Sequence, residues 1–357
     1  MKRRIRNIVA DVCRAAGILR YSERRNSGSL TVLCYHRVLP QAQKVRYFAP
    51  ELVVTPEAFR AHCRMLREQF NVLPLSKAID AWRAGEQCDR PLAAITFDDG
   101  YWDNAYFAAP ILADFRLPAT FFVVADFVGT AAVLWFDRLA RAYAHLQRAH
   151  KTSDAWKAAS DSGLDSASIG KLAGCRCAGE LVSRAKALTS EQRNRLMDFM
   201  SAAAGLGGGE EQQDDRLMDW QQLAALANAG HEIGSHGLTH EILPQLDDHA
   251  LESEVAESRR IIERRLDVPV RAFCYPNGDV DDRVVRAVQS AGYRSAVSVE
   301  PGVNEPACDP YRLKRWFINE DRLAGPSGRA SDTLLRMEIC SLADRIFRRR
   351  RRRAVPL

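Results

Sequence analysis

Thr96-Phe97-Asp98-Asp99-Gly100 is the stretch on which the expected fold depends. It follows the apolar run Leu92-Ala93-Ala94-Ile95, which is typical of a buried strand. Two adjacent carboxylates therefore emerge where a strand meets a turn bounded by glycine. The α/β folds place their chemistry at such strand ends. Asp and Gly are also ordinary turn residues, so this stretch alone does not separate a functional site from a structural turn.

A second motif, further along the chain, is Gly230-His231-Glu232-Ile233-Gly234-Ser235-His236-Gly237-Leu238-Thr239-His240. It places two histidines, His236 and His240, beside a short apolar segment. Imidazole nitrogens and carboxylate oxygens together suit a divalent metal ion. Three protein ligands leave a coordination position open for water. The two motifs together therefore indicate metal chemistry more strongly than either does alone.

Three motifs in this order resemble those of the polysaccharide deacetylase family, also called the NodB-homology or carbohydrate esterase 4 family. Thr96-Phe97-Asp98-Asp99-Gly100 is similar to its first motif, and Ser235-His236-Gly237-Leu238-Thr239-His240 is similar to its second. Phe273-Cys274-Tyr275-Pro276-Asn277-Gly278 resembles the aromatic-Pro-Gly segment that walls the family's site. The resemblance covers roughly residues 30–320, with one large interruption.

Length and composition limit the classes of protein to which this chain can belong. The chain has 357 residues, 46% of them apolar, which is enough for one enlarged catalytic domain with a large core, or for two domains. The nine cysteines include Cys175 and Cys177 but no pair of C-x-x-C motifs, which favours free thiols in a reducing compartment. No apolar run of 18 residues and no secretory signal is recognisable, so we expect a cytoplasmic protein without a membrane-spanning helix.

Strand and helix signals alternate along the chain, which predicts parallel strands joined by helical crossovers. A barrel and a doubly wound sheet both satisfy this pattern. The family resemblance favours an α/β fold with a distorted (β/α) barrel of about seven strands. The expected strands are 30–34, 72–75, 92–95, 119–124, a strand that carries His236, 270–274, 294–299 and 312–318.

We expect the catalytic domain to occupy residues 29–130 and 218–325, with a mainly helical insertion at 131–217. The insertion begins near Trp135-Phe136-Asp137-Arg138-Leu139 and contains a flexible glycine-rich joint at Gly205-Leu206-Gly207-Gly208-Gly209-Glu210. It either covers the mouth of the barrel and selects the substrate or decorates a surface far from the site, and the sequence leaves both open.

Both chain ends are basic and amphipathic. Residues 1–28 carry apolar residues at helical spacing among arginines, and residues 326–357 end in the arginine run Arg348–Arg353. Both patterns suit peripheral contact with anionic lipid headgroups. The alternatives are a helix packed on the domain at the first end and a solvated tail at the second. Specific nucleic-acid binding ranks last, because no recognition motif accompanies the charge.

The resemblance implies a site chemistry. Asp99, His236 and His240 are expected to hold a divalent metal ion, first of all Zn²⁺, although the donor set also admits Co²⁺, Ni²⁺ or Fe²⁺. Asp98 is then the general base. The segment Tyr275-Pro276 is expected to supply a backbone N–H to the oxyanion. Candidates for orienting Asp98 are Arg271 and Arg312.

One departure from the family concerns the general acid. The family's usual acid is a histidine on a late strand, and this chain has no histidine after His249. His36, in Tyr35-His36-Arg37-Val38 at the end of the first expected strand, is the preferred substitute. Metal-bound water and an enzyme of impaired or changed reaction are the alternatives.

The sequence therefore predicts a metal-dependent hydrolase that removes N-acetyl groups from amino sugars of a polysaccharide or a lipid-linked glycan at the inner membrane face. A deformylase or amidase acting on another C–N substrate, and a non-catalytic glycan-binding relative, are the alternatives. The sugar, its linkage, the choice between N- and O-acyl groups and the oligomeric state stay open.

Overall fold

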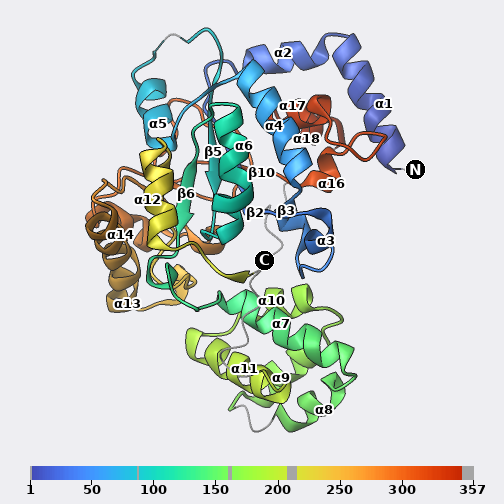
Figure 1. Cartoon of the computed structure of the whole chain (residues 1–357), viewed down its shortest axis with the longest axis vertical. Helices are drawn as coiled ribbons and strands as arrows, with labels where there is room; N and C mark the ends of the chain where they lie inside the picture. The colour runs from blue at the N-terminus through green and yellow to red at the C-terminus, as the bar shows by residue number, and fades with distance from the viewer. Residues whose placement is uncertain (1, 87, 160–162, 207–214, 348–357) are drawn as a thin grey trace.

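The computed structural model describes residues 2–86, 88–159, 163–206 and 215–347 (Figure 1). The arginine run Arg348–Arg353 of the expected basic tail and part of the expected glycine-rich joint lie outside the described residues.

A parallel sheet forms the centre of the molecule. Its strands follow the order β10-β1-β5-β6-β7-β8-β9, and β4 pairs with the first residues of β5. The strands are β1 (Thr31–Tyr35), β4 (Asn71–Val72), β5 (Leu92–Phe97), β6 (Thr120–Val123), β7 (Glu232–Ser235), β8 (Ala272–Cys274), β9 (Ser295–Val297) and β10 (Trp316–Phe317). A separate pair consists of β2 (Arg37–Val38) and β3 (Val53–Val54). The predicted distorted barrel of about seven strands is confirmed.

The segment before and within β10 links the two ends of the curled sheet. Leu313 forms a parallel bridge with Val297 of β9, and three residues later Trp316 pairs with Leu33 of β1. The side chains between these two positions therefore point either into the barrel or away from it. This register decides which arginine of the segment enters the site.

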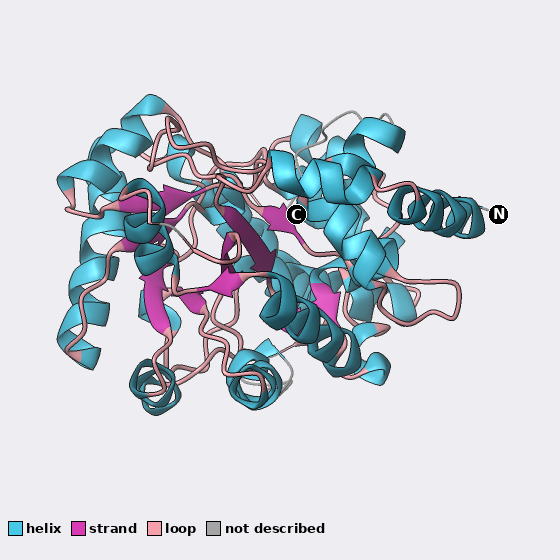
Figure 2. Ribbon diagram, turned by 90° about the horizontal axis from the view of Figure 1, so that it is seen from above, coloured by secondary structure: helices cyan, strands magenta, loops and turns pink. Residues whose placement is uncertain are grey.

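Helices surround the sheet, as Figure 2 shows from above. They are α4 (Pro56–Gln69), α5 (Leu75–Arg83), α6 (Ala109–Asp114), α12 (Trp220–Asn228), α13 (Asp248–Glu252), α14 (Ser258–Leu266) and α15 (Asp282–Ser290). Thr55 caps α4 through Ala58 N–H, and Asp219 forms a capping box with Gln222 at the start of α12. These local signals fix where the crossovers begin.

The two faces of each strand pack into different cores. On β5, Ala93, Ile95 and Phe97 lie beneath the outer helices, whereas Ala94 faces the barrel interior. Alternate residues of a strand point to opposite faces. The side chains of Thr96 and Asp98 therefore face the barrel interior, as that of Ala94 does. Asp99 begins the turn that follows the strand.

Residues 135–203 form a helical lobe next to the carboxyl ends of the strands (Figure 1). Its helices are α7 (Trp135–Arg148), α8 (Thr152–Lys157), α9 (Ser166–Ala173), α10 (Ala178–Ala185) and α11 (Ser190–Ala203). The lobe shares a hydrophobic core with Cys34, Tyr101, Val124 and Phe317 of the barrel. Gly129 N–H donates to the Met218 carbonyl at 3.0 Å, so the chain leaves and re-enters the barrel at adjacent points.

The chain ends pack against each other beside the barrel. They comprise α1 (Lys2–Ala15), α2 (Ile18–Arg25), α16 (Glu320–Leu323), α17 (Asp332–Ile339) and α18 (Leu342–Phe347), with α3 (Gln41–Lys44) nearby. Arg336 donates two hydrogen bonds of 2.7 Å to Glu23, and one face of α1 buries Ala10 and Cys13. In the described part of the chain, no helix is both long and apolar enough to cross a bilayer.

Candidate active site

The Asp98-Asp99 turn begins where β5 ends. Asp98 N–H extends the ladder by donating to the Tyr35 carbonyl at 3.0 Å, and the chain then reverses at Asp99 and Gly100. Asp99 has φ 71° and Gly100 has φ 77°, both in the left-handed region. Such a conformation is costly for a residue other than glycine and is concentrated at functional sites. Gly100 suits this turn because of its positive φ and because a Cβ would lie only 3.1 Å from Val123 Cγ1.

Asp99 faces two histidines. Its Oδ1 atom lies 3.4 Å from His236 Nε2 and 3.4 Å from His240 Nε2, and all three side chains are buried. These separations exceed the usual range of an N–H···O hydrogen bond. Two ligand atoms at zinc-bonding distance from one tetrahedral ion lie about 3.4 Å apart. The donor set and its spacing therefore fit a divalent metal ion.

The loop after β7 holds the two histidines in place. His236 Nδ1 lies 2.8 Å from the Cys274 carbonyl, so a proton on Nδ1 leaves Nε2 free to act as a ligand. His240 has φ 64°, a second strained residue at this point. The carboxylate of Glu254 accepts Leu238 N–H at 2.8 Å and Thr239 N–H at 3.1 Å, which fixes the loop between the histidines.

Asp98 pairs with a buried arginine. Arg315 Nη1 donates to Asp98 Oδ1 at 2.6 Å, and Arg315 Nη2 donates to Asp98 Oδ2 at 2.7 Å. Burial raises the pKa of Asp98, but the Arg315 guanidinium outweighs burial and holds that pKa at about 2. Asp98 is therefore ionised at neutral pH while Asp99 faces the histidines. The two neighbouring carboxylates have separate partners.

The family model described as polysaccharide deacetylase matches residues 85–168 and 187–296, more than half of the chain. The chain belongs to the polysaccharide deacetylase family.

Two curated relatives match over short stretches. The peptidoglycan-N-acetylglucosamine deacetylase of Bacillus cereus is 29% identical over 68 residues, which are 19% of this chain and 32% of the relative. YxkH of Bacillus subtilis, whose name carries a provisional assignment as a polysaccharide deacetylase, is 27% identical over 99 residues, 28% of this chain and 36% of the relative. The chain spans about a third of the length of these relatives.

Solved structures support the fold. The deacetylase PplD of Streptococcus pyogenes, in complex with acetate, has a TM-score of 0.54 at 16% identity, covering 84% of this chain and 96% of that chain. IcaB from Ammonifex degensii has a TM-score of 0.54 at 16% identity and covers 87% of this chain and 97% of that chain. At these identities the likeness shows the fold alone.

The structure corrects the arginines expected to orient Asp98 in this polysaccharide deacetylase. Arg271 precedes β8, at the opposite end of the strand from the site. Arg312 points outward and pairs with Asp282 at 2.5 Å. Arg315 takes the predicted place, because the register between β9 and β1 turns its side chain into the barrel.

The oxyanion role of Tyr275 and Pro276 stays a prediction, and the contacts of both residues in this structure count against it. Tyr275 N–H already donates to the Val297 carbonyl at 3.2 Å, and its hydroxyl donates to the Tyr311 carbonyl at 2.9 Å. Pro276 has no N–H. The next residue, Asn277, has φ 57°, and its buried Nδ2 has no hydrogen-bond partner among the described residues. Asn277 is therefore the better candidate donor in this segment.

His36 lies where the sequence placed it, beside Asp98. Its Nε2 atom is 3.9 Å from Asp98 Oδ2, its ring meets Phe317 edge to face, and its side chain is 7% exposed. Burial lowers the pKa of His36, although the nearby Asp98 and Asp99 carboxylates oppose that effect. The structure thus brings Asp98, Asp99, His236, His240 and His36 together at one end of the barrel.

A charged network behind the Asp98-Asp99 turn escaped the sequence analysis. Arg37, which follows His36, donates to Asp103 at 3.0 Å and to Asp215 at 2.9 Å in a fully buried position. Tyr101 and Tyr47 lie against the Arg37 guanidinium, and both hydroxyls donate to Asp137 of α7, at 2.6 Å and 2.8 Å. Arg37 itself was the available signal for this network. It follows an apolar strand, and an arginine that is buried there requires charged partners.

The helical lobe contacts one of the candidate metal ligands directly. The Phe136 ring lies edge to face on the His240 ring, with centroids 5.2 Å apart. Arg193 of α11 forms an ion pair with Glu241, the residue after His240, and donates to Gln245 at 2.8 Å. Burial lowers the pKa of Lys186 to about 8, against the opposing carboxylates of Asp279 and Asp99. The lobe therefore contributes to the walls of the site.

Proposed function

We propose that this chain is a metal-dependent hydrolase that removes an N-acetyl group from an amino sugar in a polysaccharide or a lipid-linked glycan. The observation that carries the proposal is the buried cluster of Asp99, His236 and His240 beside an ionised Asp98. Family membership supports this reaction over other metal-assisted hydrolyses. A binding protein has no need of an ionised base next to the ligands.

Asp99, His236 and His240 are the residues that hold the metal ion in this proposal. Zn²⁺ fits the one oxygen and two nitrogen donors, and Co²⁺, Ni²⁺ and Fe²⁺ are the alternatives. A divalent ion in such a site polarises the acyl carbonyl and lowers the pKa of water.

Asp98 acts as the general base. Its carboxylate accepts a proton from the attacking water, and Arg315 keeps both carboxylate oxygens in a fixed orientation while this happens. A carboxylate committed to metal binding is a poor base, so the division of labour between Asp98 and Asp99 explains two adjacent residues.

His36 is the proposed general acid. It lies on the Asp98 side of the site, and its protonated, imidazolium form gives the Nε2 proton to the leaving amine nitrogen as the C–N bond breaks. The unpartnered Asn277 amide is the proposed donor to the oxygen that gains negative charge on the acyl carbon. His36 is buried, and so is the Nδ2 atom of Asn277.

The proposed substrate is a glycan made or modified at the inner membrane face, and the basic chain ends provide the peripheral contact with anionic lipid. A deformylase or amidase reaction uses the same proton transfers. Substrate panels separate these reactions.

The first experiment measures acetate release from N-acetylated oligosaccharides and glycolipids, using metal-reconstituted wild type, Asp98→Asn and Asp99→Ala. We expect release by the wild type alone, one metal per chain in Asp98→Asn, and metal loss in Asp99→Ala. Stoichiometric metal without release of acetate or formate from any substrate, together with saturable glycan binding, would identify a binding protein instead. Metal retained by Asp99→Ala would refute the ligand assignment.

A further inference from the structure

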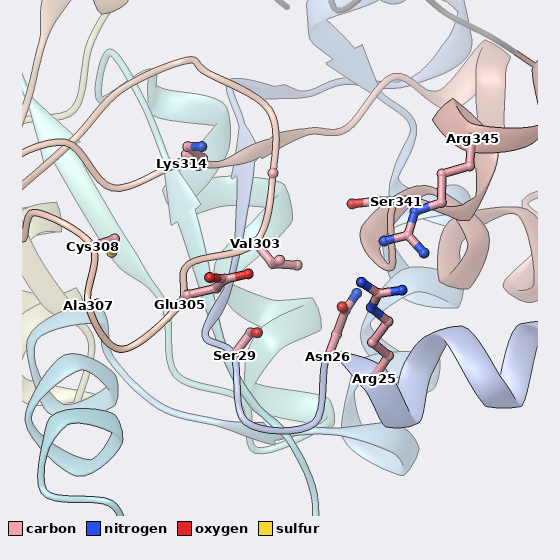
Figure 3. Close-up of a pocket in the computed structure, with 11 residues that line it drawn as sticks. Arg25, Asn26, Ser29, Val303, Glu305, Ala307, Cys308, Lys314, Ser341 and Arg345 are labelled. Carbon is pink, nitrogen blue, oxygen red and sulfur yellow. The ribbon is translucent and has the colours of Figure 1, made fainter.

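A second pocket lies among the helices of the two chain ends (Figure 3). Its volume is about 480 Å³, and its lining includes Arg25, Ser29, Lys314, Ser341 and Arg345 together with one carboxylate, Glu305. Arg25 ends α2, and Arg345 belongs to α18. Segments from both ends of the chain therefore form its walls.

This pocket is separate from the proposed catalytic site. Ser29 precedes β1 and Lys314 precedes β10, whereas Asp98 follows β5. All three strands are parallel, so the pocket lies toward the opposite end of the sheet. A ligand here does not reach the Asp98-Asp99 turn, and the catalytic mechanism assigns the pocket no role.

Two arginines in the pocket lack protein partners. Figure 3 shows the guanidinium groups of Arg25 and Arg345 turned toward one another. Across the described residues, neither side chain has a hydrogen bond or an ion pair, whereas Lys314 pairs with Glu300 at 3.2 Å. Two neighbouring cations repel each other, and an anion between them reverses the sign of that interaction. The planar fork of guanidinium donors matches the oxygens of a phosphate.

The two N-terminal helices expose large apolar side chains. On α1, Ile5, Ile8 and Val12 are 53%, 62% and 58% exposed, on one face of the helix. On α2, Ile18 and Tyr21 are 44% and 70% exposed, and Arg25 continues their helical face. Five of the eight large hydrophobic residues exposed in the described structure belong to these two helices, which marks an interface rather than scattered exposure.

We propose that α1, α2 and this pocket form a docking surface for an anionic phospholipid bilayer. Arg25 and Arg345 bind the phosphate of a lipid headgroup, and the exposed apolar residues of α1 and α2 enter the interfacial region. Amphipathic helices with a basic flank lie in membrane interfaces in this way. The exposed apolar residues favour a lipid over a free phosphate, because a soluble anion leaves these side chains in water. This inference rests on the peripheral lipid contact of the proposed function and assigns it to particular residues, and it does not depend on deacetylation.

The test is flotation of the full-length protein with phosphatidylcholine vesicles, with and without phosphatidylglycerol. Each arginine near an anionic surface contributes about fivefold to binding, so Arg25→Gln/Arg345→Gln should weaken the affinity about 25-fold. Arg148→Gln/Arg329→Gln is the matched control, because both residues are exposed, neither lines the pocket and neither lies on α1 or α2. Ile8→Ser/Val12→Ser should also weaken binding, whereas Tyr106→Ser, exposed on another surface, should not.

Three results would overturn the proposal. Equal losses in the pocket variant and its control would reduce the effect to net charge. Equal binding to pure phosphatidylcholine vesicles would remove the role of the anionic headgroup. Saturable binding of inorganic phosphate by the wild type without any vesicle binding would make the ligand a free phosphate. Circular dichroism of each variant separates loss of binding from loss of fold.

Discussion

At the scale of single residues, the buried pair of Asp98 and Arg315 carries the first prediction. Arg315→Lys keeps the charge but loses the two-pronged contact, so we expect acetate release to fall while metal content stays at the wild-type level. Arg315→Met leaves Asp98 charged and unpaired, which should lower the free energy of unfolding by about 3–5 kcal/mol. Steady-state kinetics, metal analysis and urea unfolding measure the three quantities.

Arg312→Lys is the matched control for that prediction. Arg312 pairs with Asp282 at the surface, where substitutions change stability by about 0.5 kcal/mol or less. Activity should be unchanged. If Arg312→Lys impaired turnover and Arg315→Lys did not, the corrected assignment would be wrong.

The second residue-scale prediction concerns His36. A general acid matters most when the leaving group needs a proton, so His36→Gln should lose about 10²–10⁴-fold on an N-acetyl sugar. An aryl acetate, whose phenolate leaves without a proton, should be hydrolysed at a nearly unchanged rate. Parallel kcat measurements on both substrates, with the surface variant His249→Gln as control, test this. Equal losses on both substrates would reduce His36 to a positioning role.

At the scale of elements, α7 brings a buried carboxyl to the barrel. Burial and the neighbouring Asp215 raise the pKa of Asp137 to about 8, against Arg37 and the hydroxyls of Tyr101 and Tyr47. The unfolded chain releases this proton near pH 4, whereas the folded chain keeps it until about pH 8. Folding stability should therefore fall as pH rises through this window, because the folded state binds more protons.

Asp137→Asn tests that linkage. The amide does not ionise, so the variant should lose less stability between pH 5 and pH 8 than the wild type. Urea unfolding at the two pH values gives the difference. Asp198→Asn, at an exposed position of α11, is the control and should follow the wild type. Identical pH slopes in Asp137→Asn and wild type would contradict the raised pKa.

A further element-scale prediction concerns the tether between α11 and the loop after His240. Arg193 is buried and bonds to the Leu188 carbonyl, Gln245 and Glu241. Arg193→Met should increase amide hydrogen exchange in residues 186–193 and 241–245 and weaken metal binding. Arg195→Met, whose arginine pairs with Glu191 on the exposed face, should leave both unchanged. Unaltered exchange in Arg193→Met would exclude a tether.

These elements show why the sequence predicted some features and missed others. Thr55-Pro56 and Asp219 are local helix signals, and both caps form. The partner of Asp98 lies 217 residues away, and only the pairing of Leu313 with Val297 and of Trp316 with Leu33 selects Arg315. Ordinary helical periodicity also misses Glu254, because a π-helical turn at Ser253–Glu257 changes the register of the helix.

At the scale of the whole molecule, the contacts of the helical lobe favour a cover over the site and not a decoration on a distant surface. It contacts both loops that carry the proposed metal ligands, because Asp137 accepts a hydrogen bond from Tyr101 and Phe136 packs on His240. It also shares a core with the barrel. Each contact restrains a side chain next to the proposed ligands. Partners in this outer shell typically change metal affinity about 10–100-fold.

Removing the lobe is therefore the most informative truncation. Gly129 and Met218 are hydrogen-bonded neighbours, so a short Gly-Ser linker in place of residues 131–214 closes the chain and keeps Asp215 with Arg37. We expect metal affinity, measured by chelator competition, to fall about 10–100-fold. The full-length variant Phe136→Ala/Asp137→Asn/Arg193→Met should reproduce this loss if the lost contacts cause it. A truncated protein with wild-type metal affinity and acetate release would make the lobe a decoration after all.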